Sequence, residues 1–132
     1  MRKSLTSTEL SAAFGPSPVR LQCATTAAEY LMMAAQLARA PIAVMSWHCD
    51  DRVHPIAAIG LNPFEALALA ERGAAGIADQ DEAHIVDCFD DHDFLAQLSI
   101  ADDYPSAILI CAPIATPSGE ILGALNLLCA EG

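Results

Sequence analysis

The sequence predicts an α+β domain built on a central antiparallel sheet of five to six strands. Helix-capping signals open four segments, and five other segments show the apolar runs or the alternation that strands require. Short polar turns join two pairs of these strands, and hairpins of this kind pair their strands antiparallel. Because helices and strands do not alternate strictly, we expect the N-terminal helices to lie on one face of the sheet.

Two N-terminal helices are expected, over residues 6–14 and 27–39. Thr6 with Glu9, and Thr26 with Glu29, have the spacing of a capping box, in which side chains and backbone N–H groups bond reciprocally. The second segment carries an apolar stripe at helical spacing, formed by Ala27, Leu31, Ala34 and Ala38. Pro41 should end this helix, because the residue before a proline avoids helical geometry.

A hairpin is expected next, with strands over residues 42–49 and 53–61. Strand alternation places Ser46 and His48 on one face and Trp47 on the other, where it should pack under the helices. The polar sequence CDDR supplies the turn. Pro55 predicts that the return strand lies at an edge or carries a bulge, because proline cannot donate to the strand ladder.

A helix is expected next over residues 63–72, then a strand over 84–88 and a short helix over 91–98. A final hairpin follows, with strands over residues 107–114 and 120–130. Asn62 suits the N-cap of the first helix, Pro63 its first position and Gly73 the position past its end. Asp90 and Asp93 can cap the short helix. The sequence TPSG is typical of the turn that joins the last two strands.

Charge and composition exclude several classes of protein. The chain has 132 residues, enough for one domain, and a net charge of −11 with no Lys or Arg after Arg72, so nucleic acid is not an expected partner. No apolar run approaches the ~18 residues of a membrane helix, and no apolar stretch follows the basic N-terminus as in a signal peptide. Five cysteines without close pairs favour a reducing compartment. We therefore expect a cytoplasmic protein that binds no membrane.

Four pieces of the sequence carry a family pattern. They are ARAPIAVMSW, VMSWHCDDRVHPIAAIGL, HIVDCFDDHDF and ILICAPIATPSGEILGALNLL. In this order they resemble GAF domains, small sensory and regulatory relatives of PAS domains, and the last piece is the most specific. The resemblance runs from Cys23 to Cys129. It implies an N-terminal helix and linker over residues 1–22 and a GAF-like domain over residues 23–132 that lacks the family's C-terminal helix.

The resemblance implies a domain that binds a small-molecule ligand, forms a homodimer, or both, and has no catalysis of its own. It would control a signalling effector domain or partner protein of the histidine kinase, cyclic-di-GMP enzyme or transcription regulator type. The patterns of the cyclic-nucleotide-binding and bilin-binding members are not found, so the cofactor is unknown. Two alternatives stay open: a free methionine-(R)-sulfoxide reductase and a ligand-free dimerisation module.

A candidate pocket follows from the resemblance, because the family holds ligands between the sheet and the loops and short helices on the face away from the N-terminal helices. Ser46 and His48 share the strand face that fits this wall. Asn126 is the one polar residue of the last strand, and a buried amide needs hydrogen-bond partners from a ligand or the protein. Three aromatic residues would cover the pocket or belong to the core: Phe89, Phe94 and Tyr104.

The sequence offers no convincing metal, haem or catalytic thiol site. His84, Asp87, Cys88, His92 and Asp93 cluster in the sequence but lack the spacing of a metal site, and His48, His84 and His92 suit a haem ligand by residue type only. Acidic residues surround Cys88, and no basic residue lies near Cys111 or Cys129 to lower a thiol pKa, so no catalytic residue is assigned.

The final hairpin carries two cysteines and one expected close approach. Cys111 and Cys129 are expected to be reduced, buried thiols, and their mirrored places around the final turn suggest cross-strand neighbours. Gly123 should let a neighbouring group approach the last strand closely.

Overall fold

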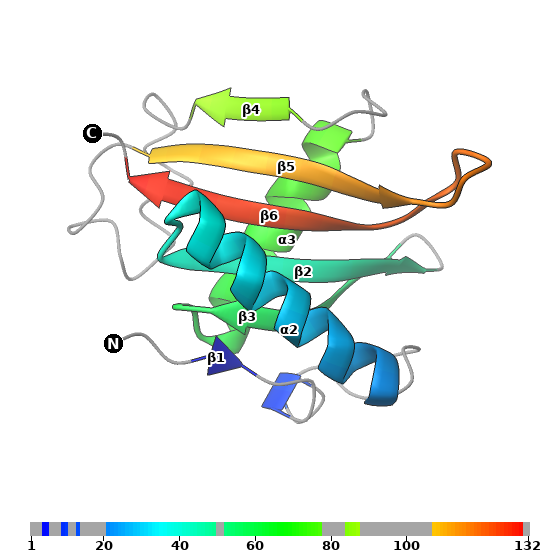
Figure 1. Ribbon diagram of the computed structural model, residues 1–132, viewed down its shortest axis with the longest axis horizontal. Helices are drawn as coiled ribbons and strands as arrows, with labels where there is room; N and C mark the ends of the chain where they lie inside the picture. The colour runs from blue at the N-terminus through cyan, green and yellow to red at the C-terminus, as the bar shows by residue number, and fades with distance from the viewer. Residues whose placement is uncertain are drawn as a thin grey trace.

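The computed structural model describes residues 4–5, 9–10, 13, 21–49, 52–77, 84–87 and 107–130, and it confirms an α+β fold with an antiparallel sheet (Figure 1). The elements are β1 (Ser4–Leu5), α2 (Leu21–Ala38), β2 (Ile42–Cys49), β3 (Arg52–Ile59), α3 (Pro63–Ile77), β4 (His84–Asp87), β5 (Ala107–Ala115) and β6 (Ile121–Ala130). The helix expected over residues 91–98 lies outside the described residues. Of the helix expected over residues 6–14, only Glu9, Leu10 and Ala13 are described, and all three are helical.

The sheet has the strand order β1-β3-β2-β6-β5-β4, and every neighbouring pair is antiparallel. The long strands β2, β3, β5 and β6 form its body, and the short strands β1 and β4 lie at its edges. Both predicted hairpins are present. The two hairpins form one sheet because β2, the first strand of the first hairpin, pairs with β6, the last strand of the final hairpin.

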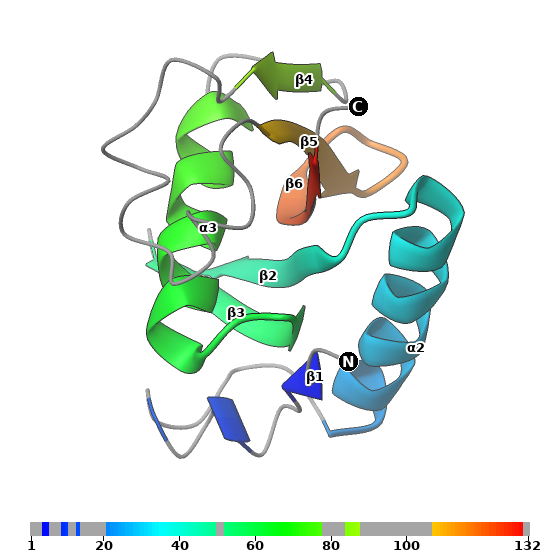
Figure 2. The same ribbon diagram turned by 90° about the vertical axis from the view of Figure 1, so that its left-hand side faces the viewer.

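Helices cover both faces of the sheet, so the described part of the molecule has three layers (Figure 2). On one face α2 packs through Leu31 and Ala35 against residues that include Ala43 and Met45. Trp47 packs against this cluster, as its strand parity predicts. The first five residues of β2 are all buried, which is the pattern of a strand covered on both faces.

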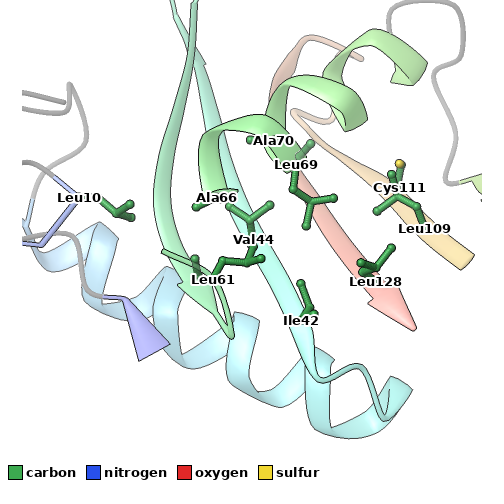
Figure 3. Close-up of a cluster of buried hydrophobic side chains, with 12 residues drawn as sticks. Leu10, Ile42, Val44, Leu61, Ala66, Leu69, Ala70, Leu109, Cys111 and Leu128 are labelled. Carbon is green, nitrogen blue, oxygen red and sulfur yellow. The ribbon is translucent and has the colours of Figure 1, made fainter. Parts of the chain in front are cut away.

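The second face differs from the expectation of loops and short helices alone. The 15-residue helix α3 lies across it and contributes Ala66, Leu69 and Ala70 to the core (Figure 3). The sheet residues that meet them include Ile42, Val44, Leu109, Cys111 and Leu128. Small alanines on α3 let the helix approach the sheet closely, which explains how a helix of this length fits there.

α2 begins at Leu21, six residues before the predicted start at Ala27. No Pro or Gly stands between Leu21 and Thr26, so nothing interrupts the helix there, and the Thr26–Glu29 pair lies inside it.

The C-terminus of α2 is a Schellman motif. Ala40 N–H donates to Ala35 O over 2.8 Å, and Arg39 N–H donates to Gln36 O over 3.2 Å. Arg39 takes the left-handed conformation with φ 54°. The helix therefore ends before Pro41, as predicted.

The first hairpin contains the bulge that Pro55 predicts. Met45 pairs with Ala57, but the next residue, Ser46, pairs with Pro55, so Ile56 is the extra residue on β3. The bulge accommodates the missing N–H of Pro55. It also changes the side-chain parity of β3: Ile56 and Ala57 both join the cluster under α2.

The final hairpin closes as the sequence TPSG predicts. Gly119 N–H donates to Thr116 O and Thr116 N–H donates to Glu120 O, each over 2.9 Å. Gly119 has φ 93°, which favours glycine. Among the residues described, no helix is long and apolar enough to cross a membrane.

Candidate functional site

The site lies on the face of β2 and β6 that α3 covers, and the N-terminus of α3 is fixed by a reciprocal cap. Glu65 N–H donates to Asn62 Oδ1 over 2.8 Å, and Asn62 N–H donates to Glu65 Oε1 over 2.9 Å. Pro63 occupies the first helical position, where its missing N–H costs nothing. The predicted start of α3 at Pro63 is confirmed. The side chain of Glu65, to which the sequence analysis gave no role, completes the cap and so fixes the end of α3 from which the helix crosses the sheet.

Gly73 lies inside α3, not past its end as predicted, since the helix continues to Ile77. A Cβ on residue 73 would overlap the side-chain amide of Asn126. The glycine is therefore required by close packing between α3 and β6, rather than by helix termination. Its Cα–H faces Asn126 Oδ1, and such a contact is at best a weak hydrogen bond.

Asn126 is fully buried, and neither its Oδ1 nor its Nδ2 has a hydrogen-bond partner. Its neighbours across the strands are Val44 on β2 and Cys111 on β5, both members of the apolar cluster under α3. An unpaired buried amide costs about 1–3 kcal/mol. This residue is the clearest departure from simple core packing in the described part of the chain.

Ser46 is also fully buried, and its hydroxyl makes two long contacts. Ser46 Oγ donates to Ala124 O over 3.5 Å and lies 3.4 Å from His48 Nε2. Ser46 pairs with Ala124 and Asn126 pairs with Val44, so Ser46 and Asn126 are diagonal neighbours on one face of the sheet. The structure thus brings Ser46, His48 and Asn126 onto the same face, as the strand alternation predicts.

His48 is half-buried on this face, opposite Val53 of β3. Burial lowers the pKa of the His48 imidazole, because removal from water disfavours its charged form. At neutral pH the ring is therefore uncharged and can accept or donate one hydrogen bond on each side, depending on its tautomer. Ser46, His48 and Asn126 together offer neutral donors and acceptors, which suits binding of an uncharged polar group.

Gly123 brings β2 and β6 together beside Ser46. A Cβ on residue 123 would overlap the carbonyl oxygen of Ser46, so the predicted close approach to this strand is confirmed. The group that approaches is the backbone of β2.

The two cysteines of the final hairpin are not cross-strand neighbours, contrary to expectation. Cys111 pairs with Asn126 and Cys129 pairs with Ile108. Cys111 is buried under α3, as expected, whereas Cys129 is only half-buried and packs against the cluster under α2. Burial raises the pKa of the Cys129 thiol, which favours its unreactive protonated form.

The remaining predicted site residues, Phe89, Phe94 and Tyr104, lie outside the described residues. Sequence reasoning assigned Gly73 to a helix end and so missed its contact with Asn126. The run of small residues GAAG around it was the available signal for close packing. Within the described ranges, no group of three or more His, Cys, Asp or Glu side chains could hold a metal ion.

Comparison of the chain with models of known protein families and with functionally characterised proteins finds no match.

Proposed function

We propose that this chain is a cytoplasmic sensory or regulatory domain of the GAF type, which binds a small molecule and passes the change to a signalling effector. The four sequence pieces described above support the family. The fold agrees with it at a coarser level: an antiparallel sheet carries α2 on one face, and Ser46, His48 and Asn126 lie on the other face beside the apolar cluster under α3. In this proposal the domain has no catalysis of its own.

The observation that carries the proposal is the buried amide of Asn126 without partners. A ligand with one donor and one acceptor side by side, such as a lactam, a primary amide or a nucleobase edge, would satisfy both atoms. Ser46 and His48 would add neutral hydrogen-bonding groups on the same face. No charged ligand is required, because this part of the site carries no charge at neutral pH.

The contact between Gly73 and Asn126 would also couple ligand binding to the signalling effector. Gly73 of α3 packs directly on the Asn126 amide, so a ligand that takes these hydrogen bonds must displace that part of α3. Binding would therefore shift the helix relative to the sheet, and the effector would respond to this shift.

A thermal-shift screen tests the proposal. A ligand present at 100 times its dissociation constant should add about 2.7 kcal/mol to the free energy of unfolding. Asn126→Val should abolish the effect, whereas Leu127→Val, on the opposite face of the same strand, should retain it. Hydrogen exchange should become faster over residues 63–77 with ligand bound. If no lactam, amide or nucleobase stabilises the protein, or if Asn126→Val keeps the effect, the proposal fails.

The sulfoxide-reductase alternative gains no support from the two cysteines of the final hairpin. Cys111 is fully buried, and the pKa of the Cys129 thiol is raised. Both properties oppose nucleophilic attack by a thiolate.

A further inference from the structure

Two adjacent methionines lie on the exposed surface of α2. Met32 and Met33 are 42% and 56% exposed, and neither belongs to a core cluster. In Figures 1 and 2 no described element covers the outer side of this helix. Methionine usually fills irregular gaps in a core, whereas the sulfur atoms of this pair are open to reagents in solution.

The third described methionine has the opposite environment. Met45 of β2 is 7% exposed and lies in the apolar cluster under α2. A sulfoxide at Met45 would place an unpaired polar oxygen in this core, whereas a sulfoxide at Met32 or Met33 would face water. The fold therefore tolerates oxidation of the α2 pair and opposes oxidation of Met45. Met1 lies outside the described residues.

The charge of the protein favours a neutral oxidant. The chain has a net charge of −11, which repels anionic oxidants, whereas hydrogen peroxide carries no charge. We propose that Met32 and Met33 are reversible oxidation sites, which a neutral hydroperoxide converts to methionine sulfoxide in the folded protein.

The reaction needs no group other than the thioether and the peroxide. The thioether sulfur attacks one peroxide oxygen, an S–O bond forms as the O–O bond breaks, and a proton transfer to the departing oxygen releases water from hydrogen peroxide. The sulfur is oxidised and the peroxide is reduced, so the step balances without a further reactant.

Oxidation changes the outer side of α2 from apolar to polar. Met33 lies three residues after Tyr30 and four residues before Leu37, so the three side chains share one side of the helix. Tyr30 and Leu37 are 61% and 85% exposed. A sulfoxide at Met33 adds a polar oxygen between them, and sulfoxide reductases remove it again. The surface of α2 thus follows the balance of oxidant and reductant, independently of the candidate ligand site.

Peptide mass spectrometry of the full chain after timed exposure to hydrogen peroxide tests the sites. In the folded protein Met32 and Met33 should each oxidise at least about tenfold faster than Met45, because Met45 meets the oxidant only when the core opens. The control is the same chain in urea, where burial no longer protects Met45 and the three rates should agree within about twofold. The reaction is run at about pH 5, where the cysteine thiols are protonated and slow to react, since a thioether does not titrate.

Hydrophobic interaction chromatography tests the change in the surface. Oxidised wild type should elute earlier than untreated protein, and treatment with reductases for both sulfoxide epimers should restore its elution. Met32→Leu with Met33→Leu keeps the surface apolar and removes both sulfur atoms, so peroxide should leave its elution unchanged. Met45→Leu is the matched control, and it should shift as the wild type does. Circular dichroism establishes that each form is folded.

Four results overturn the proposal: equal oxidation rates of the three methionines in the folded protein; a difference in rate that persists in urea, which would come from sequence context and not from burial; no elution shift of the oxidised wild type; and a shift that survives in the double leucine variant, which would place the oxidised group elsewhere.

Discussion

Asn126 Oδ1 occupies the space that a Cβ atom on residue 73 would need, so the side chain of β6 and the backbone of α3 are fitted to each other. This contact joins the two elements at the centre of the candidate site. It explains a glycine in the interior of a helix, where glycine costs about 1 kcal/mol relative to alanine. A glycine inside a helix and an unpaired amide in the core each lower the stability of the folded protein, and these two residues are in direct contact.

Gly73→Ala should therefore destabilise the protein by about 1–3 kcal/mol, in spite of the better helix propensity of alanine. Urea unfolding measures the change. In an Asn126→Ala background the Cβ has room, and the same substitution should cost at least about 1 kcal/mol less. A gain in stability for Gly73→Ala alone, as at an exposed helix position, would contradict the close packing.

Asn126→Val should stabilise the protein by about 1–2 kcal/mol, because it removes two unpaired polar atoms and places a β-branched residue in a strand. Ser46→Ala is the matched control on the adjacent strand. Its hydroxyl has partners, so its loss should destabilise the protein by about 0.5–1 kcal/mol. Thermal and urea unfolding measure both variants. A clear loss of stability for Asn126→Val would show that the amide is satisfied after all.

Gly123→Ala and Gly119→Ala test two different reasons for glycine in one hairpin. At position 123 a Cβ meets the backbone of β2, which cannot move aside easily, so we expect a loss of about 2–3 kcal/mol. At position 119 space is open but φ is 93°, so we expect about 1–2 kcal/mol. Asparagine tolerates positive φ and should recover part of the loss at position 119 only. Recovery by Gly123→Asn would argue against the steric explanation.

The sequence was sufficient where the controlling interaction is local. Asn62 and Pro63 were enough to predict the start of α3, because a helix cap depends on neighbours in the chain; only the second bond of the cap, to Glu65, was not predicted. Strand alternation was enough to place Trp47 under α2 and Ser46 on the other face, because the side-chain period of a strand is two residues.

The sequence was insufficient where distant elements meet. Gly73 looked like a helix stop because its partner, Asn126, is 53 positions away. Cys111 and Cys129 were expected to pair because they are symmetric about residue 120. The tight turn at residues 117–119 and a register shift between Ile114 and Ala115 set the pairing of the hairpin, and Cys111 faces Asn126 instead. The start of α2 was missed because Thr26 and Glu29 have capping spacing inside a helix that nothing interrupts.

Arg39→Gly should stabilise the protein by about 0.5–1 kcal/mol. Arg39 takes a left-handed conformation in the Schellman motif of α2, and glycine adopts this conformation without the steric cost of a Cβ. Arg39→Ala is the control, since it removes the charge and keeps the Cβ. It should leave the stability within about 0.5 kcal/mol of the wild type. If both substitutions raised the stability equally, the gain would come from removal of the charge and not from the left-handed conformation.

His48 should make the protein less stable as the pH falls below about 6.5, the pKa of an unperturbed histidine. Burial lowers the pKa of His48 in the folded protein, so between the folded and unfolded pKa values the unfolded chain binds the proton and the folded chain does not. Stability therefore rises with pH through this window and is level, for this group, above it. At still lower pH, both states are protonated and the loss is complete.

The measurement is the free energy of unfolding of the wild type minus that of His48→Gln, from pH 7.5 down to about 4.5. The subtraction removes the contribution of the many carboxylates, which titrate in both proteins. The difference should decline as the pH falls through the window, and the NMR titration of the His48 ring should give a pKa below about 6.5. A difference that stays constant, or a ring that titrates above 6.5, would show that His48 is not desolvated at the edge of the candidate site.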